Sequence, residues 1–158
     1  MEVMLFGRET KENCGRILKK YIPGQLAEGV NKGKLPLKLL SQISNRDEFI
    51  LLHRRQPEEY WCLFCNGQDG VTRMAQRNHL RTLTCGFSPY DTLVLSSSAP
   101  EEAVVSLQRE IQTGINSILE PGDYIVHHSP YSTEPAVLLC TGTLLLMGKG
   151  QEEREFYF

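Results

Sequence analysis

Four potential metal ligands stand close together in the middle of the sequence. They are three cysteines and a histidine, with the spacing Cys62-x2-Cys65-x13-His79-x5-Cys85. Three thiolates and an imidazole make a closed tetrahedral set, which Zn²⁺ accepts with no open coordination position. The sequence therefore predicts one structural zinc ion, without the activated water that hydrolysis needs. The alternative is that Cys62 and Cys65 are buried core thiols and that His79 lies on a helix surface.

This run resembles a C2HC-type zinc finger, a relative of the C2H2 fingers, between Tyr60 and Cys85. Tyr60 precedes the first ligand by two residues, as the aromatic residue that often begins such a knuckle. The stretch Asn66–Gly70 suits the turn that follows. The resemblance implies a zinc knuckle and then a helix that carries His79. Val71 and Met74 are the only candidates for the finger's two hydrophobic positions, and both lie off the usual spacing. No tandem finger follows.

A basic stripe accompanies the predicted zinc module. Three arginines fall four residues apart on a helix predicted over 72–83, and no acidic residue lies between Gly70 and Cys85. Like charges at this spacing cost helix stability, so the stripe favours an anionic partner, either phosphates or an acidic surface. The alternative is a solvated helix face, or pairing with the acidic half of the chain. The residues expected to contact a partner are Arg73, Arg77, Arg81, Arg54 and Arg55.

The net charge of −2 conceals two halves of opposite sign. Residues 1–85 carry 14 Lys and Arg against 9 Asp and Glu, which is a net +5, and residues 86–158 carry 3 against 10, which is a net −7. A basic half is a footprint for a polyanion. The alternative is that the two halves pack together and partly neutralise each other.

Length and composition limit the classes of protein. A chain of 158 residues, 41% hydrophobic and 23% charged, is the size of one globular domain and is not disordered. The longest apolar run, Ala136–Met147, is shorter than the roughly 20 residues that a membrane span needs. We also expect no signal peptide, because Arg8 to Glu12 falls where its apolar region would lie. Five cysteines, an odd number, then favour a reducing, intracellular compartment, cytoplasm or nucleus.

Periodicity predicts an α+β fold: a mostly antiparallel sheet packed on helices, with the zinc knuckle-helix module inserted between strands. We expect one domain over 1–150 that contains the module at 60–85, and a C-terminal tail over 151–158, either a mobile end or a last edge strand. The predicted helices cover 9–21, 35–43, 72–83 and 99–119. The predicted strands cover 49–53, 60–64, 92–97, 124–128 and 136–147, the last as one strand or a hairpin.

The helix over 99–119 has the clearest local signals. Ser98 and Glu101 form a capping box with Pro100 in the first turn, and an apolar stripe follows that box. Pro121 stops the predicted helix.

Candidates for catalysis are few. His127 and His128 follow a predicted strand, but adjacent residues on a strand point to opposite faces, so the two cannot easily share a site. Cys14 and Cys140 are expected in the core, and a Cys140–His128 nucleophile pair has no oxyanion hole beside it. The sequence has no phosphate loop, dinucleotide fingerprint, nucleophile elbow or HExxH motif.

The sequence thus predicts a non-enzymatic regulatory or accessory protein that acts by protein–protein interaction and carries a structural zinc finger. In that case the tail Glu155–Phe158 or the arginine face is the contact. Nucleic-acid binding through phosphate contacts is the alternative, and an unidentified enzyme comes third. A small one-domain chain with an odd zinc finger is also a common form among viral accessory proteins. A homodimer, paired through the edge of a strand over 136–147, stays open.

Overall fold

The fold was obtained as a computed structural model, which describes residues 2–6, 13–21, 26–28, 37–40, 60–65, 67, 69–113 and 117–158. The described helices are α1 (Gly15–Tyr21), α3 (Asp69–Arg77), α4 (Glu134–Leu146) and the short 3-10 helix η3 (Lys149–Gln151). The strands are β1 (Glu2–Phe6), β2 (Leu26–Glu28), β3 (Leu37–Leu40), β4 (Tyr60–Cys65), β5 (Arg81–Gly86), β6 (Leu93–Ser98), β7 (Glu102–Leu107), β8 (Ile111–Gln112), β9 (Ile118–Leu119), β10 (Gly122–His127) and β11 (Glu155–Tyr157).

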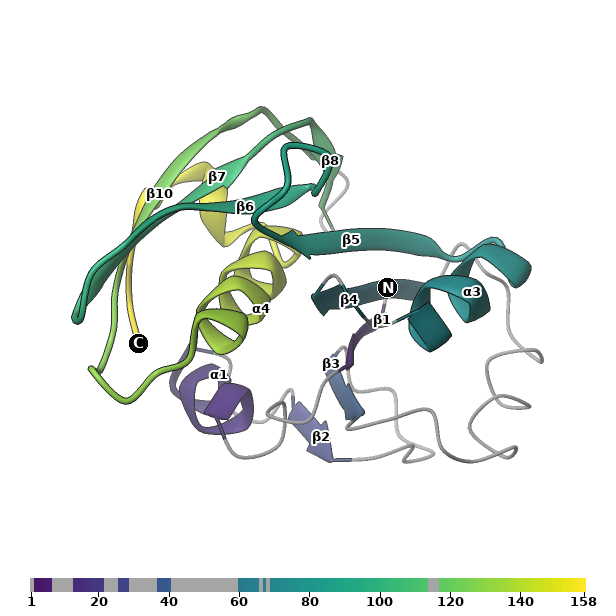
Figure 1. Cartoon of the computed structure of the whole chain (residues 1–158), viewed down its shortest axis with the longest axis horizontal. Helices are drawn as coiled ribbons and strands as arrows, with labels where there is room; N and C mark the ends of the chain where they lie inside the picture. The colour runs from purple at the N-terminus through teal and green to yellow at the C-terminus, as the bar shows by residue number, and fades with distance from the viewer. Residues whose placement is uncertain are drawn as a thin grey trace.

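Nine strands form one curled, mixed sheet in the order β11-β10-β7-β6-β5-β4-β1-β3-β2, and β8 pairs with β9 in a small ribbon. The expected α+β class is confirmed. The two antiparallel pairs are β6 with β7 and β7 with β10. On the other side of β6, each neighbouring pair of strands through β5, β4, β1, β3 and β2 is parallel. The sheet curls around α4, and α1 lies beside that helix (Figure 1).

Helix α4 occupies the segment predicted as a strand, so that prediction was wrong. Thr133 caps the helix by accepting a hydrogen bond from the Ala136 N–H at 3.4 Å, and Pro135 lies in the first turn. Every residue from Ala136 to Leu146 is buried, as expected of a helix that is apolar all round. A continuous apolar run of this length does not distinguish a buried strand from a buried helix.

The predicted helix over 99–119 is also wrong. The chain instead turns tightly after β6, where the Ala99 N–H donates to the Glu102 carbonyl at 2.7 Å, and returns as β7. Ser98 is the last residue of β6, so its spacing to Glu101 belongs to a hairpin and not to a capping box. Val104 and Val105 lie in β7, and such β-branched residues fit a pleated sheet better than a helix.

Two further boundaries differ from the prediction. The predicted helix over 72–83 ends early: α3 stops at Arg77, His79 adopts a left-handed φ of 52°, and the chain continues as β5. The helix predicted over 35–43 is wrong at 37–40, where β3 pairs with β1. Helix α1 confirms the predicted helix over 9–21 in its last part, whereas 9–12 and the predicted strand over 49–53 lie outside the described residues. The strands predicted near β4, β6 and β10 are confirmed.

The predicted tail supplies the edge strand β11, which pairs in parallel with β10. Phe156 is fully buried and stacks on Tyr124, with ring centroids 6.0 Å apart. The Tyr21 hydroxyl of α1 contacts both backbone groups of Tyr157: it accepts from the N–H at 2.6 Å and donates to the carbonyl at 2.8 Å. The edge-strand alternative is therefore the one found. No helix in the described part of the chain has the length and hydropathy to span a bilayer.

Candidate functional site at the carboxyl edge of the sheet

All strands of the nine-stranded sheet except β7 run in the same direction and end toward the same edge. β4, β5 and β6 are mutually parallel, and β10 shares their direction because β7 is antiparallel to both β6 and β10. In the sheet, β3 and β2 lie on one side of β1, and β4 and the later strands lie on its other side. The direction in which successive strands are added therefore reverses between β1 and β4. In sheets of this kind, ligands bind outside the carboxyl ends of the strands near such a reversal. We call this region the carboxyl edge.

An apolar hollow of about 390 Å³ opens at this edge, between the end of β5 and the start of α4. A hollow of this size is in the range of small-molecule sites. Asp91 is buried there, and its Oδ2 accepts a hydrogen bond from the Ser88 N–H at 3.2 Å, which fixes the β5–β6 loop. The lining residues are Cys65, Cys85, Gly86, Phe87, Ser88, Asp91, Glu134, Pro135 and Leu138.

A second hollow of about 310 Å³ also reaches the start of α4, and Glu134 borders both. His128 lines the second hollow. Its Nδ1 lies 3.0 Å from the Ser129 carbonyl oxygen, and its Nε2 is buried without a hydrogen-bond partner among the described residues. Since a carbonyl only accepts, this contact is a hydrogen bond when the His128 ring carries a proton on Nδ1. The other lining residues are Leu95, Ser98, Ala99, Pro100, Ala103, Pro130, Ser132 and Val137.

Three exposed aromatic side chains belong to the loops at this edge. Phe87 and Tyr90 are 67% and 86% exposed in the β5–β6 loop, and Tyr131 is 88% exposed in the loop before α4. The Arg109 guanidinium donates to the Tyr90 carbonyl at 2.8 Å. Aromatic side chains are enriched where proteins contact partners. The carboxyl edge therefore combines two hollows with exposed aromatic residues.

Two of the predicted zinc ligands meet at the first hollow. Cys65 and Cys85 are direct register partners on β4 and β5. Burial raises the pKa of the Cys85 thiol well above its usual value, and nearby Cys65, Asp91 and Cys14 add to the rise, so this sulfur stays protonated. The structure thus brings Cys14, which the sequence placed only in the core, toward Cys85. Cys140 of α4 interacts in turn with Cys14.

The other two predicted ligands lie elsewhere. Cys62 is three residues before Cys65 on the same strand, so its side chain points to the opposite face of the sheet. Trp61, Leu63 and Cys65 contribute to the core around α4, whereas Cys62 is buried outside that core. His79 is exposed at the end of α3. Among the described residues no three Cys, His, Asp or Glu side chains form a group that could hold a metal ion. The zinc finger remains a prediction from the sequence.

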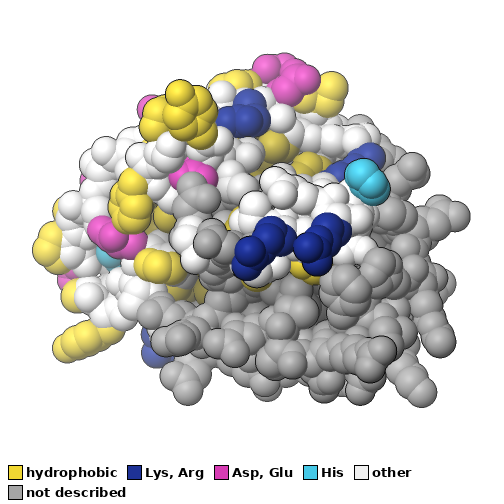
Figure 2. Space-filling view, turned by 45° about the vertical axis from the view of Figure 1, so that its right-hand side comes forward, with side chains coloured by type: hydrophobic (Ala, Val, Ile, Leu, Met, Phe, Trp, Pro, Cys, Tyr) yellow, Lys and Arg dark blue, Asp and Glu magenta, His cyan; other side chains and the backbone are white. Residues whose placement is uncertain are grey.

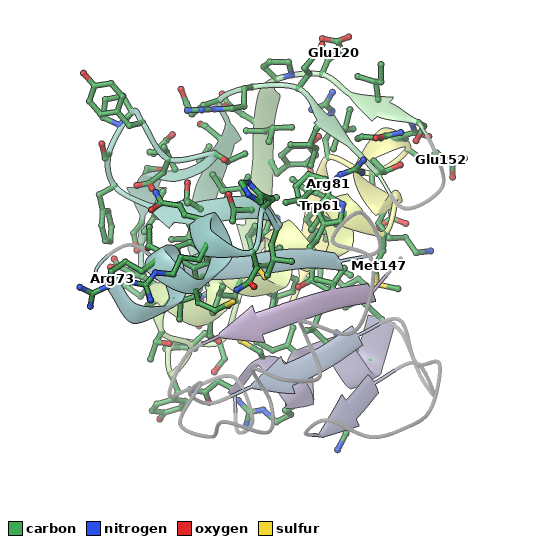
Figure 3. All side chains as sticks on the ribbon, turned by 90° about the vertical axis from the view of Figure 1, so that its right-hand side faces the viewer. Trp61, Arg73, Arg81, Glu120, Met147 and Glu152 are labelled. Atoms are coloured by element: carbon green, nitrogen blue, oxygen red, sulfur yellow. The ribbon has the colours of Figure 1, made fainter. Side chains whose placement is uncertain are left out.

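The predicted arginine stripe is divided between two elements. Arg73 and Arg77 are exposed on α3, but Arg81 begins β5, with its guanidinium 5.9 Å from the Trp61 ring centroid. Figure 3 shows Arg81 beside Trp61 and well apart from Arg73. Figure 2 shows Lys and Arg side chains in several separate places on this face, with Asp and Glu side chains toward its upper and left parts. Arg54 and Arg55 lie outside the described residues.

The two adjacent histidines occupy different surroundings. His127 stacks on Tyr157 at 4.6 Å and lies between two carboxylates, with Nδ1 3.6 Å from Glu102 and Nε2 3.8 Å from Glu155. His128 instead borders the second hollow. Comparisons with known proteins add no family, because no family model and no curated protein matches this sequence.

Proposed function

We propose that this chain is a non-enzymatic regulatory or accessory protein that docks on a partner protein through its carboxyl edge. The observation that supports this function is the exposure of Phe87, Tyr90 and Tyr131 in two loops at this edge. Large aromatic side chains contribute most to protein binding when they enter pockets of a partner. The tail is a less suitable contact, because Phe156 is buried in the protein itself.

Site-specific crosslinking tests this function. A photo-crosslinking residue is placed at Tyr90, Tyr131 or the control position Ile118, which is 61% exposed in β9. We expect one partner to be captured at Tyr90 and Tyr131 and not at Ile118. The purified partner should then bind the wild type and an Ile118→Ser variant, but not a Tyr90→Ser/Tyr131→Ser variant. Equal binding by all three proteins would contradict the proposal.

Nucleic-acid binding is the second candidate, supported by Arg73 and Arg77 four residues apart on the exposed side of α3. Such binding rests on phosphate contacts and weakens steeply as salt rises. Fluorescence anisotropy with mixed-sequence oligonucleotides should then show salt-dependent binding that Arg77→Glu reduces and Glu152→Gln does not. No binding at low salt would rule this candidate out. For either function we propose an intracellular location, which the five free cysteines support.

A further inference from the structure

Two thiols stand side by side where the first hollow opens. Cys65 is the last residue of β4, Cys85 is near the end of β5, and the two are direct register partners in a parallel pair. No disulfide joins them, and both line the hollow of about 390 Å³. Register partners on neighbouring strands send their side chains to the same face of a sheet, so the two sulfur atoms lie on the same side.

The spacing of the strands sets the separation of these two cysteines. Neighbouring strands lie about 4.7–4.9 Å apart. A disulfide joins residues whose Cα atoms are about 4.4–6.8 Å apart, so a bond between Cys65 and Cys85 requires no rearrangement of the sheet. The Cβ atoms of a relaxed disulfide are about 3.5–4.5 Å apart, which is slightly closer than the strand spacing. The bond would therefore carry some strain, and strained disulfides are the ones that thiols reduce readily.

The two thiols differ in what reaches them. Cys65 is half-buried at the hollow, whereas Cys85 is fully buried. Only the thiolate form of cysteine attacks an oxidant. Because burial raises the pKa of Cys85 well above its usual value, this sulfur stays protonated. A small oxidant that enters the hollow therefore reacts first with Cys65, and Cys85 is placed to react second.

The other three cysteines are less accessible from the hollow, because none of them lines it. Cys62 is buried, and its side chain points to the opposite face of β4. Cys14 and Cys140 interact with each other in the core and are both fully buried. These three thiols serve as internal controls for any reaction at the hollow.

We propose that Cys65 and Cys85 are a reversible redox pair: a hydroperoxide oxidises Cys65, and Cys85 then closes a disulfide with it. The Cys65 thiolate attacks one peroxide oxygen and the O–O bond breaks. The sulfur becomes a sulfenic acid, and the hydroxide that leaves takes up the proton from the Cys65 thiol to form water. The Cys85 sulfur next attacks the Cys65 sulfur, the S–O bond breaks, and the hydroxyl leaves with the Cys85 proton as a second water.

Reduction returns the pair to its thiol form. Two molecules of a small thiol exchange with the disulfide and leave as their own disulfide, which restores both cysteines. This modification goes beyond the docking function and does not depend on it, because it requires no partner protein.

Peptide mapping of the intact, folded chain tests the pair. The protein is treated with a few equivalents of hydrogen peroxide, the remaining thiols are alkylated, and the chain is cleaved after Lys and Arg. We expect the first link to join peptide 56–73 to peptide 82–109, which carry Cys65 and Cys85. Fragmentation of the linked peptides should assign the bond to Cys65 and not to Cys62, which lies in the same peptide. Excess dithiothreitol should restore the two thiols.

Three variants separate this pair from general oxidation. Cys65→Ser should abolish the link and leave Cys85 as a thiol, and Cys85→Ala should leave a Cys65 sulfenic acid that dimedone traps. Cys62→Ala is the matched control, since it removes a cysteine from the other face of the same strand, and it should form the link as the wild type does. Cys65 is half-buried, so Cys65→Ser is expected to fold even where Cys85→Ala does not. A first link through Cys62, Cys14 or Cys140, the absence of any link in the folded protein, or oxidation of Cys65 to a sulfinic acid while Cys85 stays reduced would each overturn the proposal.

Discussion

Replacement of Gly142 by alanine tests how closely α4 approaches the sheet. Gly142 is in the buried middle of α4. A Cβ atom there would lie 2.8 Å from Leu93 Cδ1, 2.9 Å from Leu63 Cδ2 and 3.3 Å from Leu83 Cδ2. These three leucines come from the adjacent strands β6, β4 and β5, and each is fully buried. The missing side chain therefore allows the helix to lie against the middle of the sheet.

Two effects of opposite sign determine the stability of Gly142→Ala. Alanine gains about 1 kcal/mol over glycine inside a helix. Insertion of a methyl group into a filled core costs about 1–3 kcal/mol, because side chains and backbone must shift. The leucine ends can move a little but are enclosed on all sides, so we expect a net loss of about 1 kcal/mol. For a domain of this size, that corresponds to a fall of about 3 °C in the unfolding midpoint.

Gly70→Ala is the matched control. Gly70 is also helical, in the first turn of α3, but it is exposed and a Cβ atom there would meet nothing within 4 Å. We expect this variant to gain about 0.5 kcal/mol, since only the restriction of the unfolded chain remains. Urea unfolding followed by circular dichroism measures both changes. Equal stabilisation by the two substitutions would refute the close approach of α4.

A double-mutant cycle locates the source of the loss. Leu63→Ala removes one of the side chains that the new methyl group would meet. In that background Gly142→Ala should cost less than in the wild type, by at least about 0.5 kcal/mol, because space has been opened beside it. Strict additivity would show that Leu63 does not contact residue 142.

Three further experiments test other parts of the structure. Tyr21→Phe should lower the free energy of unfolding by about 1 kcal/mol in urea, because both hydroxyl contacts to Tyr157 are lost at a site that water reaches; an unchanged midpoint would contradict these contacts. Burial raises the pKa of Cys62 to about 12, so the folded state holds this proton more tightly than the unfolded chain does. The stability from this group is complete below about pH 9 and should fall as the pH rises toward 12. Between about pH 8 and about pH 10, the thermal unfolding midpoint should therefore fall less in Cys62→Ala than in the wild type. EDTA should leave the thermal unfolding midpoint of the wild type unchanged, since Cys62 and Cys65 face opposite sides of β4. A lower unfolding midpoint in EDTA, together with one zinc per chain by metal analysis, would instead support the zinc finger.

The sequence predicted the fold class and several strands, because these depend on local signals. Thr92–Ser97 is rich in strand-forming residues and is strand β6 apart from its ends. Ala136–Met147 was misinterpreted because a fully buried helix has no polar face to show a helical period. The helix predicted over 99–119 was wrong for another reason. The capping pattern from Ser98 to Glu101 is local, and the hairpin pairing of β6 with β7 outweighed it.

The candidate site was harder to predict than the fold. Cys65 and Cys85 were predicted only as two of four zinc ligands, and they lie side by side on β4 and β5. Their neighbour Cys14 could not be inferred, since it reaches them only through the packing of the segment before α1 against α4, where its Sγ lies 4.0 Å from the Ala136 carbonyl oxygen. Sequence spacing describes neighbours along one element, whereas the carboxyl edge is assembled by parallel strands far apart in the chain.

The contact between Tyr21 and Tyr157 has a consequence for how the molecule meets copies of itself. β11 is the last strand of the sheet, and an open strand of this kind offers its backbone to any other chain that can pair with it. The Tyr21 hydroxyl satisfies the backbone of Tyr157 as a residue of a neighbouring strand would, since it both accepts from and donates to the same backbone unit. The Lys20 ammonium also donates to this carbonyl, at 3.0 Å, and puts a charge beside it. The side chains of Lys20 and Tyr21 thus occupy the backbone of Tyr157, where the strand of a second copy would otherwise pair.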